Sequence, residues 1–190
     1  MTESRETYNV QVAGLSRDLP LFEVARGVRI AIVNILGDVE LVKHAARELA
    51  LKLADRNPEV LVTAEAKSIP LIYELSAIMD LPYVVLRKAY KPYMGSALEA
   101  ETLSITTGAP QKLYLDEKDL RFLNGRQVAV IDDVISTGST LQGIRLIVEK
   151  AGGRIVAQAA IFTEGDRAKW TDVIALGHLP VFLSEDSKHD

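Results

Sequence analysis

Residues 128–140 read VAVIDDVISTGST, and the other segments of the chain are arranged around this stretch. Its first four residues form a short, uninterrupted apolar run, which is typical of a parallel strand buried on both faces. Two carboxylates, Asp132 and Asp133, follow the run, and a loop of small residues, 136–140, comes next. Residues 141–151 then repeat apolar side chains at helical spacing. The stretch therefore predicts a strand, a tight polar loop and a helix.

A polar loop between a strand and a helix N-terminus is suited to phosphate, because free backbone N–H groups converge there and the helix dipole favours an anion. Gly138 lets the backbone approach a ligand closely. Four residues add hydroxyl donors: Ser136, Thr137, Ser139 and Thr140. A Walker A loop is disfavoured because Ile144 stands where that motif needs lysine, and no G-x-G-x-x-G occurs. The alternative is a strand that ends in two solvated aspartates and a helix cap.

The stretch resembles the 5-phosphoribosyl-1-diphosphate (PRPP) motif of type I phosphoribosyltransferases, and the nearest branch is similar to adenine phosphoribosyltransferase. The resemblance implies that residues 136–140 hold the 5′-phosphate. It implies that Asp132 and Asp133 are the catalytic pair and hold the ribose hydroxyls, directly or through Mg²⁺ and water. The fold it implies is α/β, a central parallel sheet flanked by helices in one domain of residues 1–190. A small hood at about residues 8–36 and a flexible β-hairpin lid at about 89–116 complete it.

Bulk properties agree with one soluble α/β domain. The 190 residues carry a net charge of −4, so a general nucleic-acid surface is not expected. Cysteine is absent, which excludes disulfides and thiol catalysis and fits a reducing cytoplasm. The polar N-terminus lacks a signal core, and no apolar run approaches transmembrane length. We therefore expect a cytoplasmic protein without membrane or nucleic-acid partners.

Strands and helices alternate along most of the chain, which predicts a parallel sheet with right-handed crossovers. The expected strands are 29–36, 60–63, 83–86, 128–131, 155–162 and 173–175, and helices are expected at 38–53 and 69–79. Residues 8–29 indicate an irregular or short-stranded cap. Residues 102–106 and 111–115 alternate apolar and polar side chains around a turn at 107–110, so we predict a hairpin there after a mobile stretch at 90–101.

Two further loops would supply PRPP contacts. Residues 65–68, Glu-Ala-Lys-Ser, resemble the family's diphosphate loop, in which a non-proline cis peptide turns N–H groups toward the diphosphate. The resemblance assigns PRPP binding to three residues of this loop: Ala66, Lys67 and Ser68. In the adenine branch this loop often reads Glu-Ala-Arg-Gly, and lysine lacks the bidentate fork of arginine. A basic segment gives three more candidates, Arg87, Lys88 and Lys91, although a solvated basic turn is the simpler interpretation.

The candidate base-binding residues depart from the adenine branch. That branch usually places an aromatic residue before an Arg-Asp pair, whereas Ser16 precedes Arg17 here. Stacking would then come from elsewhere, for example from Phe22, while Val134 covers the other face of the base. The branch also commonly shows Glu-Tyr-Gly in its hairpin, whereas residues 106–108 read Thr-Thr-Gly, and threonine is a poor acid or base. Glu99 or Glu101 could assist proton transfer at the base instead, if the lid closes differently.

The function implied is transfer of the phosphoribosyl group of PRPP to a purine, adenine first, with release of diphosphate and with Mg²⁺ as cofactor. The three histidines show no metal or triad spacing, and Trp170 is interpreted as a packing residue. Relatives share basic residues across a two-fold interface, so a homodimer is expected. Two alternatives stay open: a phosphoribosyltransferase for another base, and a regulator of the same fold that binds PRPP or a purine without turnover.

Overall fold

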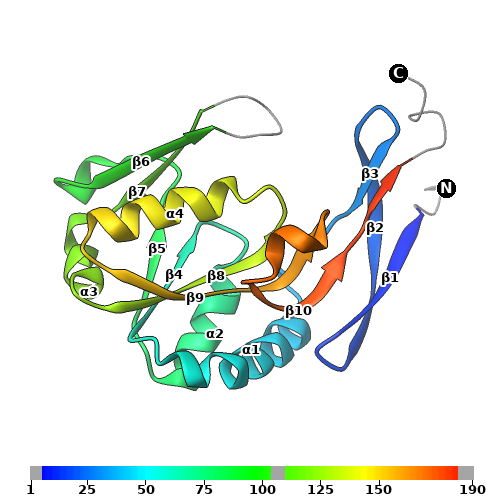
Figure 1. The fold of residues 1–190 in the computed structure, drawn as a ribbon, viewed down its shortest axis with the longest axis horizontal. Helices are drawn as coiled ribbons and strands as arrows, with labels where there is room; N and C mark the ends of the chain where they lie inside the picture. Colours follow the sequence, from blue (N-terminus) through cyan, green and yellow to red (C-terminus); the bar gives the residue numbers. More distant parts are fainter. Residues whose placement is uncertain (1–5, 104–109, 184–190) are drawn as a thin grey trace.

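The central sheet is the framework of the computed structural model, which describes residues 6–103 and 110–183 (Figure 1). Five strands, all paired in parallel, follow the order β10-β9-β8-β4-β5. Their bounds are β4 Val60–Ala64, β5 Tyr83–Leu86, β8 Gln127–Ile135, β9 Arg154–Glu164 and β10 Ile174–Leu179. Because β8 is the middle strand, its carboxyl end opens at the centre of one sheet edge, where ligands of such sheets bind.

Helices cover both faces of this sheet, as expected for an α/β protein (Figure 1). The helices are α1 Val39–Leu53, α2 Ile69–Met79, α3 Leu120–Leu123 and α4 Ser139–Lys150, with short 3-10 turns η1 Ala54–Arg56, η2 Pro92–Met94, η3 Glu117–Asp119 and η4 Arg167–Trp170. The apolar stripes of α1 and α2 are buried against one face, and that of α4 is buried against the other. Asp38 caps α1, and Pro70 lies in the first turn of α2, as predicted.

The hood is more regular than the sequence indicated. Its antiparallel sheet has the order β1-β2-β3-β11, with bounds β1 Thr7–Val12, β2 Leu15–Ala25, β3 Val28–Ala31 and β11 Val181–Leu183. Of the predicted irregular or short-stranded cap, the stranded form is present, although β2 is longer than expected at 11 residues. The strand expected at 29–36 ends at Ala31, so its extension to residue 36 was wrong. The unforeseen β11 pairs with β3, Val181 opposite Ile30, so residues near both ends of the chain build the hood.

The predicted hairpin is present, but its boundaries differ from the prediction. Strand β6, Leu98–Leu103, pairs with β7, Pro110–Leu115, so the stretch expected to be mobile already contains a strand. Leu113 and Leu115 are buried, and Leu113 packs so closely on α4 that a Cβ added at Gly143 would lie 2.9 Å from its Cδ1. The base of the hairpin is therefore part of the core. Thr106 and the turn at 107–109 lie outside the described residues.

The strands that matter for the site are longer than predicted. β8 continues through both aspartates to Ile135, and β9 and β10 extend to Glu164 and Leu179. Pairing explains the extension, since Asp132 lies beside Ala160 and Ile135 beside Thr163 on β9. The acidic pair is thus held on a hydrogen-bonded strand instead of a free loop. Within the described ranges, no helix combines the length and apolarity needed to cross a membrane.

Candidate functional site

Two carboxylates and one serine form a compact polar cluster at the carboxyl end of β8. Ser68, which precedes α2, places its hydroxyl oxygen 2.8 Å from Oδ1 of Asp132 and 3.2 Å from Oδ1 of Asp133. The same hydroxyl accepts the backbone N–H of Asp133 at 2.9 Å. Asp133 is 8% exposed and Ser68 is 2% exposed, so the cluster is shielded from solvent. Ser68 therefore supports the acidic pair, an arrangement that the glycine common in the adenine branch lacks.

The two carboxylates differ in their electrostatics. Burial, and then the charge of Asp133, raises the pKa of Asp132 to about 7. On Asp133, Oδ2 is buried and has no hydrogen-bond partner among residues 6–103 and 110–183, and Nζ of Lys67 lies 3.9 Å away. A buried oxygen without a partner is costly, so this atom is suited to a ligand that brings a positive charge or a hydroxyl donor.

The loop after β8 leaves a helix N-terminus open. Gly138, at φ +81°, is the N-cap of α4 and provides no side-chain cap for its first N–H groups. A small cradle of about 30 Å³ lies there, lined by Asp132, Val134, Ile135, Ser136, Thr137, Gly138, Thr140 and Leu141. The Ser139 hydroxyl is buried beside that of Thr137, at 3.1 Å, so only its backbone N–H is a candidate phosphate donor.

A second pocket, of about 180 Å³, adjoins the cradle and contains the loop at residues 65–68. It is lined by Ala64, Glu65, Ala66, Lys67, Ser68, Lys88, Asp132, Asp133, Val134 and Thr140. Three of these residues, Asp132, Val134 and Thr140, also line the cradle, so the two hollows are continuous. The peptide bond between Glu65 and Ala66 is cis, as the resemblance implied. Loops from β4, β5 and β8 thus meet at one sheet edge.

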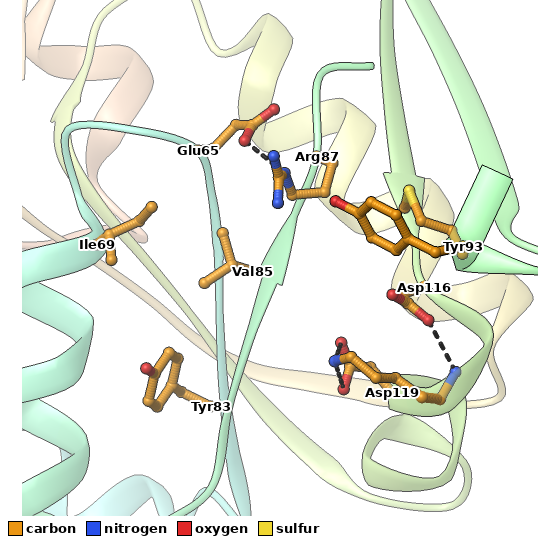
Figure 2. A pocket seen from close by; sticks show the side chains of 10 residues that line it. Glu65, Ile69, Tyr83, Val85, Arg87, Tyr93, Asp116 and Asp119 are labelled. Carbon is orange, nitrogen blue, oxygen red and sulfur yellow. Dashed lines mark hydrogen bonds and ion pairs between the residues drawn. The ribbon is translucent and has the colours of Figure 1, made fainter. Parts of the chain in front are cut away.

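The three basic candidates separate in the structure. Lys88 lines the pocket beside the acidic pair, and its backbone N–H donates to Oε1 of Glu65 at 2.7 Å. Arg87 is paired with Glu65 and lines a different pocket, of about 410 Å³, with Tyr83 and Tyr93 (Figure 2). Lys91 lines neither pocket and lies on the exposed surface before η2. Lys88 is therefore the basic residue that the structure brings to the acidic pair.

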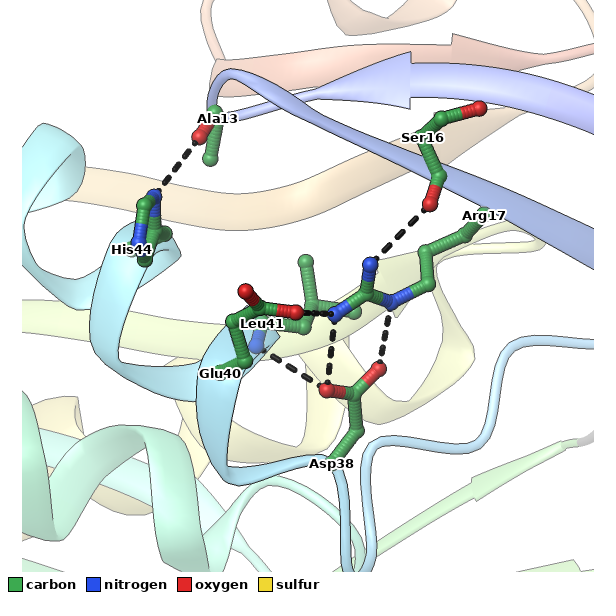
Figure 3. Close-up of polar contacts among 7 residues, drawn as sticks. All are labelled: Ala13, Ser16, Arg17, Asp38, Glu40, Leu41 and His44. Carbon is green, nitrogen blue, oxygen red and sulfur yellow. Dashed lines mark hydrogen bonds and ion pairs between the residues drawn. The ribbon is translucent and has the colours of Figure 1, made fainter.

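The base-binding candidates also separate. Val134 lines both the cradle and the pocket beside it. Four of the five guanidinium N–H groups of Arg17 are engaged: Nε and Nη2 donate to Asp38 at 2.7 and 3.0 Å, Nη2 donates to Glu40, and Nη1 donates to the carbonyl of Ser16 (Figure 3). The Ser16 hydroxyl is exposed and accepts from Asn9. Arg17 thus ties β2 to the start of α1, and one Nη1 N–H has no partner among the described residues.

Three residues have contact partners that were not predicted from the sequence. The Ser68 hydroxyl was assigned to PRPP, yet it bonds to the acidic pair. The ring of Trp170 lies against Gly138, where an added Cβ would be 2.9 Å from the indole. His178 places Nδ1 2.9 Å from the Thr163 hydroxyl and Nε2 3.1 Å from the Gly165 carbonyl, which fixes the turn after β9. No local sequence pattern predicts these contacts, because each one joins residues that are separated in the sequence and meet only in the folded chain.

Comparisons with known proteins agree with this geometry. The model of the phosphoribosyl transferase domain matches residues 31–175. The chain is 34% identical to a hypoxanthine/guanine phosphoribosyltransferase of Methanococcus voltae over 143 residues, 75% of this chain and 69% of that protein. It is 34% identical to an adenine phosphoribosyltransferase of Methanococcus maripaludis over 137 residues, 66% of this chain and 70% of that protein. In fold it resembles the crystal structure of adenine phosphoribosyltransferase from Thermoanaerobacter pseudethanolicus, with a TM-score of 0.67, 20% identity and coverage of 91% and 95%.

Proposed function

Because the chain belongs to the type I phosphoribosyltransferase family, we propose that it transfers the phosphoribosyl group of PRPP to a purine base. The products are a nucleoside monophosphate and diphosphate. The observation that carries the proposal is the continuity of the two hollows around Asp132 and Asp133, one at an open helix N-terminus and one beside Lys67 and Lys88. The sequence resemblance and the named relatives support the choice of a purine.

In this proposal each part of PRPP has its own protein groups. The 5′-phosphate occupies the cradle, held by the N–H groups of residues 138–140 and by the hydroxyls of Ser136, Thr137 and Thr140. The ribose hydroxyls face Asp132 and Asp133. The diphosphate lies against the backbone of Ala66 and the ammonium groups of Lys67 and Lys88, which neutralise its charge as the bond to the ribose breaks.

The acidic pair fits Mg²⁺, which prefers oxygen ligands and retains waters and substrate oxygens. The partnerless Oδ2 of Asp133 is the atom suited to the ion, directly or through water, and Asp132 is adjacent. Among the described residues there is no cluster of three or more metal-ligating side chains, so substrate oxygens and water would have to complete the coordination of a bound ion. A bound ion would neutralise negative charge on the leaving diphosphate. Because the pKa of Asp132 is raised to about 7, a bound ion would favour the ionised form of that carboxyl.

The protein accelerates the reaction mainly by orientation and charge stabilisation in this account. Positioning of reactants alone supplies about 7–11 kcal/mol in well-oriented systems. Val134 packs beside the base, and the hairpin of β6 and β7 is the proposed lid, whose closure favours transfer over hydrolysis. No side-chain acid or base is assigned to the purine.

Adenine is our first choice of base, and hypoxanthine or guanine is the second. The fold neighbour favours adenine, whereas the relatives of similar identity include enzymes named for either class. The test is steady-state release of diphosphate from PRPP and Mg²⁺ with adenine, hypoxanthine, guanine, xanthine and orotate. A preference for one purine supports the proposal. Turnover with orotate alone, or with none of the bases, contradicts it.

We also propose a homodimer formed through the face around β5. Five exposed apolar or aromatic side chains gather on α2, β5 and the segment after β5: Tyr73, Ile78, Tyr83, Tyr90 and Tyr93. The rings of Tyr73 and Tyr83 are in contact, and Arg87 lines the pocket on this face. Light scattering should give about twice the 20.8 kDa mass of the chain. Tyr93→Ser should weaken the dimer, whereas Leu51→Ser, at an exposed position on α1, should not; a fully active monomer contradicts the proposal.

A further inference from the structure

A pocket of about 410 Å³ lies next to the phosphate cradle and has no role in the proposed transfer. It shares Thr137, Gly138 and Leu141 with the cradle, so these two hollows adjoin, but it shares no residue with the pocket around the acidic pair. Residues of α4, β9 and η4 complete its wall. This volume is within the range of small-molecule sites and exceeds what a single inorganic anion requires.

The unpaired amide of Gln158 is the first sign of a ligand site. Gln158 lies on β9, is 9% exposed and lines the pocket. Its side chain has no hydrogen-bond partner within the described part of the chain. Its amide atoms are reached by solvent in the pocket, so their donors and acceptor are open to a ligand. A ligand with both a donor and an acceptor on one edge would satisfy this amide.

Two cations on the pocket rim are the second sign. Arg145 on α4 and Lys169 on η4 line the pocket, and neither forms an ion pair with a described residue. Asp172 is the single carboxylate in the wall, so the local charge is positive by one. A phosphate group is the complementary anion, and arginine binds it with a bidentate geometry.

A fixed aromatic ring is the third sign. Trp170 lines the pocket, and its indole N–H donates to the Glu164 carbonyl at 3.0 Å, which holds the ring in place. The edge of the ring, at Cη2, lies against Gly138. Planar bases stack on such rings, with a contribution of about 1–3 kcal/mol per base in single-strand binding proteins.

We infer that this pocket is a second site for a nucleotide, separate from the catalytic one. The phosphate pairs with Arg145 and Lys169, the base stacks on Trp170, and the polar edge of the base bonds to the Gln158 amide. The assignment goes beyond the proposed transfer reaction, which uses the cradle and the pocket around the acidic pair. A bound nucleotide would contact the ring that supports Gly138.

The test measures nucleotide binding while the catalytic site is blocked, a design that relies on the proposed function. PRPP and Mg²⁺ are held at saturation without free base, after calorimetry has verified PRPP binding. AMP and GMP are then titrated by equilibrium dialysis, and the emission of Trp170, the single tryptophan of the chain, is followed. We expect one equivalent of at least one nucleotide per chain, with a change in emission.

Three variants separate the site from general charge effects. Arg145→Ala with Lys169→Ala should weaken nucleotide binding at least about tenfold, and Gln158→Met should weaken it severalfold. Lys43→Ala with Arg47→Ala, at exposed positions on α1, removes the same charge and should change nothing. Thermal melts verify folding. The inference is overturned if no nucleotide binds beside PRPP, if the α1 control loses equal affinity, or if inorganic phosphate binds as tightly as the nucleotide. A failure of PRPP itself to bind would instead contradict the proposed function, and the variant comparison then still tests this pocket without PRPP.

Discussion

Two helices, α1 and α4, begin next to the central sheet and differ in how their first N–H groups are satisfied. At α1, the Asp38 carboxylate accepts the N–H of Leu41 at 3.0 Å and also pairs with Arg17 (Figure 3). At α4, the N-cap is Gly138, which has no side chain to offer. At the first N-terminus a carboxylate caps one N–H group, whereas the second has no side-chain cap and leaves donors for a ligand. The capped start of α1 therefore has a structural role, whereas the uncapped start of α4 is the candidate binding site.

The aspartates near these two helices differ in the same way. Hydrogen bonding to Arg17 lowers the pKa of Asp38, which is therefore stabilised as a carboxylate. Burial and the neighbouring Asp133 raise the pKa of Asp132. One carboxylate has its countercharge inside the protein, and the other lacks it. The following predictions change one member of each matched pair.

The largest contrast is expected in catalysis. Asp133→Asn removes the charge of the carboxylate whose Oδ2 has no hydrogen-bond partner among the described residues, and should lower kcat/KM about 100-fold or more. Asp38→Asn retains a capping side chain but loses the ion pair, so it should lower the unfolding free energy by about 1–2 kcal/mol and keep kcat/KM within about threefold. Steady-state kinetics and urea unfolding measure both. Equal losses of kcat/KM would remove the distinction between the two regions.

The next contrast concerns the pH dependence of stability. For Asp132 the folded pKa, about 7, lies above the unfolded value of 3.8, so the folded state binds the extra proton and stability falls as pH rises from about 4 to 7. Asp132→Asn should abolish this fall and be more stable than the parent at about pH 8, by on the order of 2 kcal/mol. The pKa of Asp38 is lowered, so its contribution is present above the unfolded pKa and is lost in acid.

Urea unfolding of the parent, Asp132→Asn and Asp38→Asn at several pH values measures this contrast. The Asp132→Asn difference should grow as pH rises toward neutrality. The Asp38→Asn difference should shrink in acid, because the parent then loses the same ion pair. Parallel pH profiles for all three proteins would show that the two carboxylates have equivalent environments.

A smaller effect is expected from two glycines in matched conformations. Gly37, at φ +88°, precedes the Asp38 cap and has open space around it, whereas Gly138, at φ +81°, has Trp170 at 2.9 Å from an added Cβ. Alanine at either position should cost about 1–2 kcal/mol of stability through backbone strain. Gly138→Ala alone should also raise the KM for PRPP about tenfold, because the loop must shift. An equal KM for both variants would contradict the assignment of the cradle.

The smallest effect is expected at Arg17. Arg17→Lys retains the charge but loses the bidentate contact with Asp38, and should lower the unfolding free energy by about 1 kcal/mol. Its KM for PRPP should stay within about twofold of the parent. A large rise in the KM for the base, with stability unchanged, would restore Arg17 as a direct base ligand.

The sequence predicted the centre of the fold because its patterns there are local. An apolar run, two acids, a small-residue loop and a helical stripe all lie within residues 128–151, and the structure has each element in that order. The hood was predicted poorly because β11 pairs with β3 across some 150 residues, and no local pattern specifies such a partner. The hairpin limits were missed because Leu98–Glu101 is polar on one side and becomes a strand through pairing with β7.

For the site, the sequence predicted which residues line it but not which of them contact one another. The residues that line the two continuous hollows were largely named from the motifs, including Ala66, Lys67, Lys88, Asp132 and Asp133. The sequence does not specify which polar groups form hydrogen bonds with one another. Arg17 is engaged by Asp38, 21 positions away, and Ser68 bonds to carboxylates more than 60 positions away. These contacts depend on the folded geometry and decide which groups stay free for substrate.

The central claim is that PRPP binds the open N-terminus of α4 and leaves the closed N-terminus of α1 unchanged. Backbone amide NMR of the ¹⁵N-labelled chain, titrated with PRPP and Mg²⁺, tests it most directly. We expect large shifts for the amides of Gly138, Ser139 and Thr140, and almost none for Leu41 or Val42. Equal shifts at both helix starts, or shifts at neither, would contradict the account.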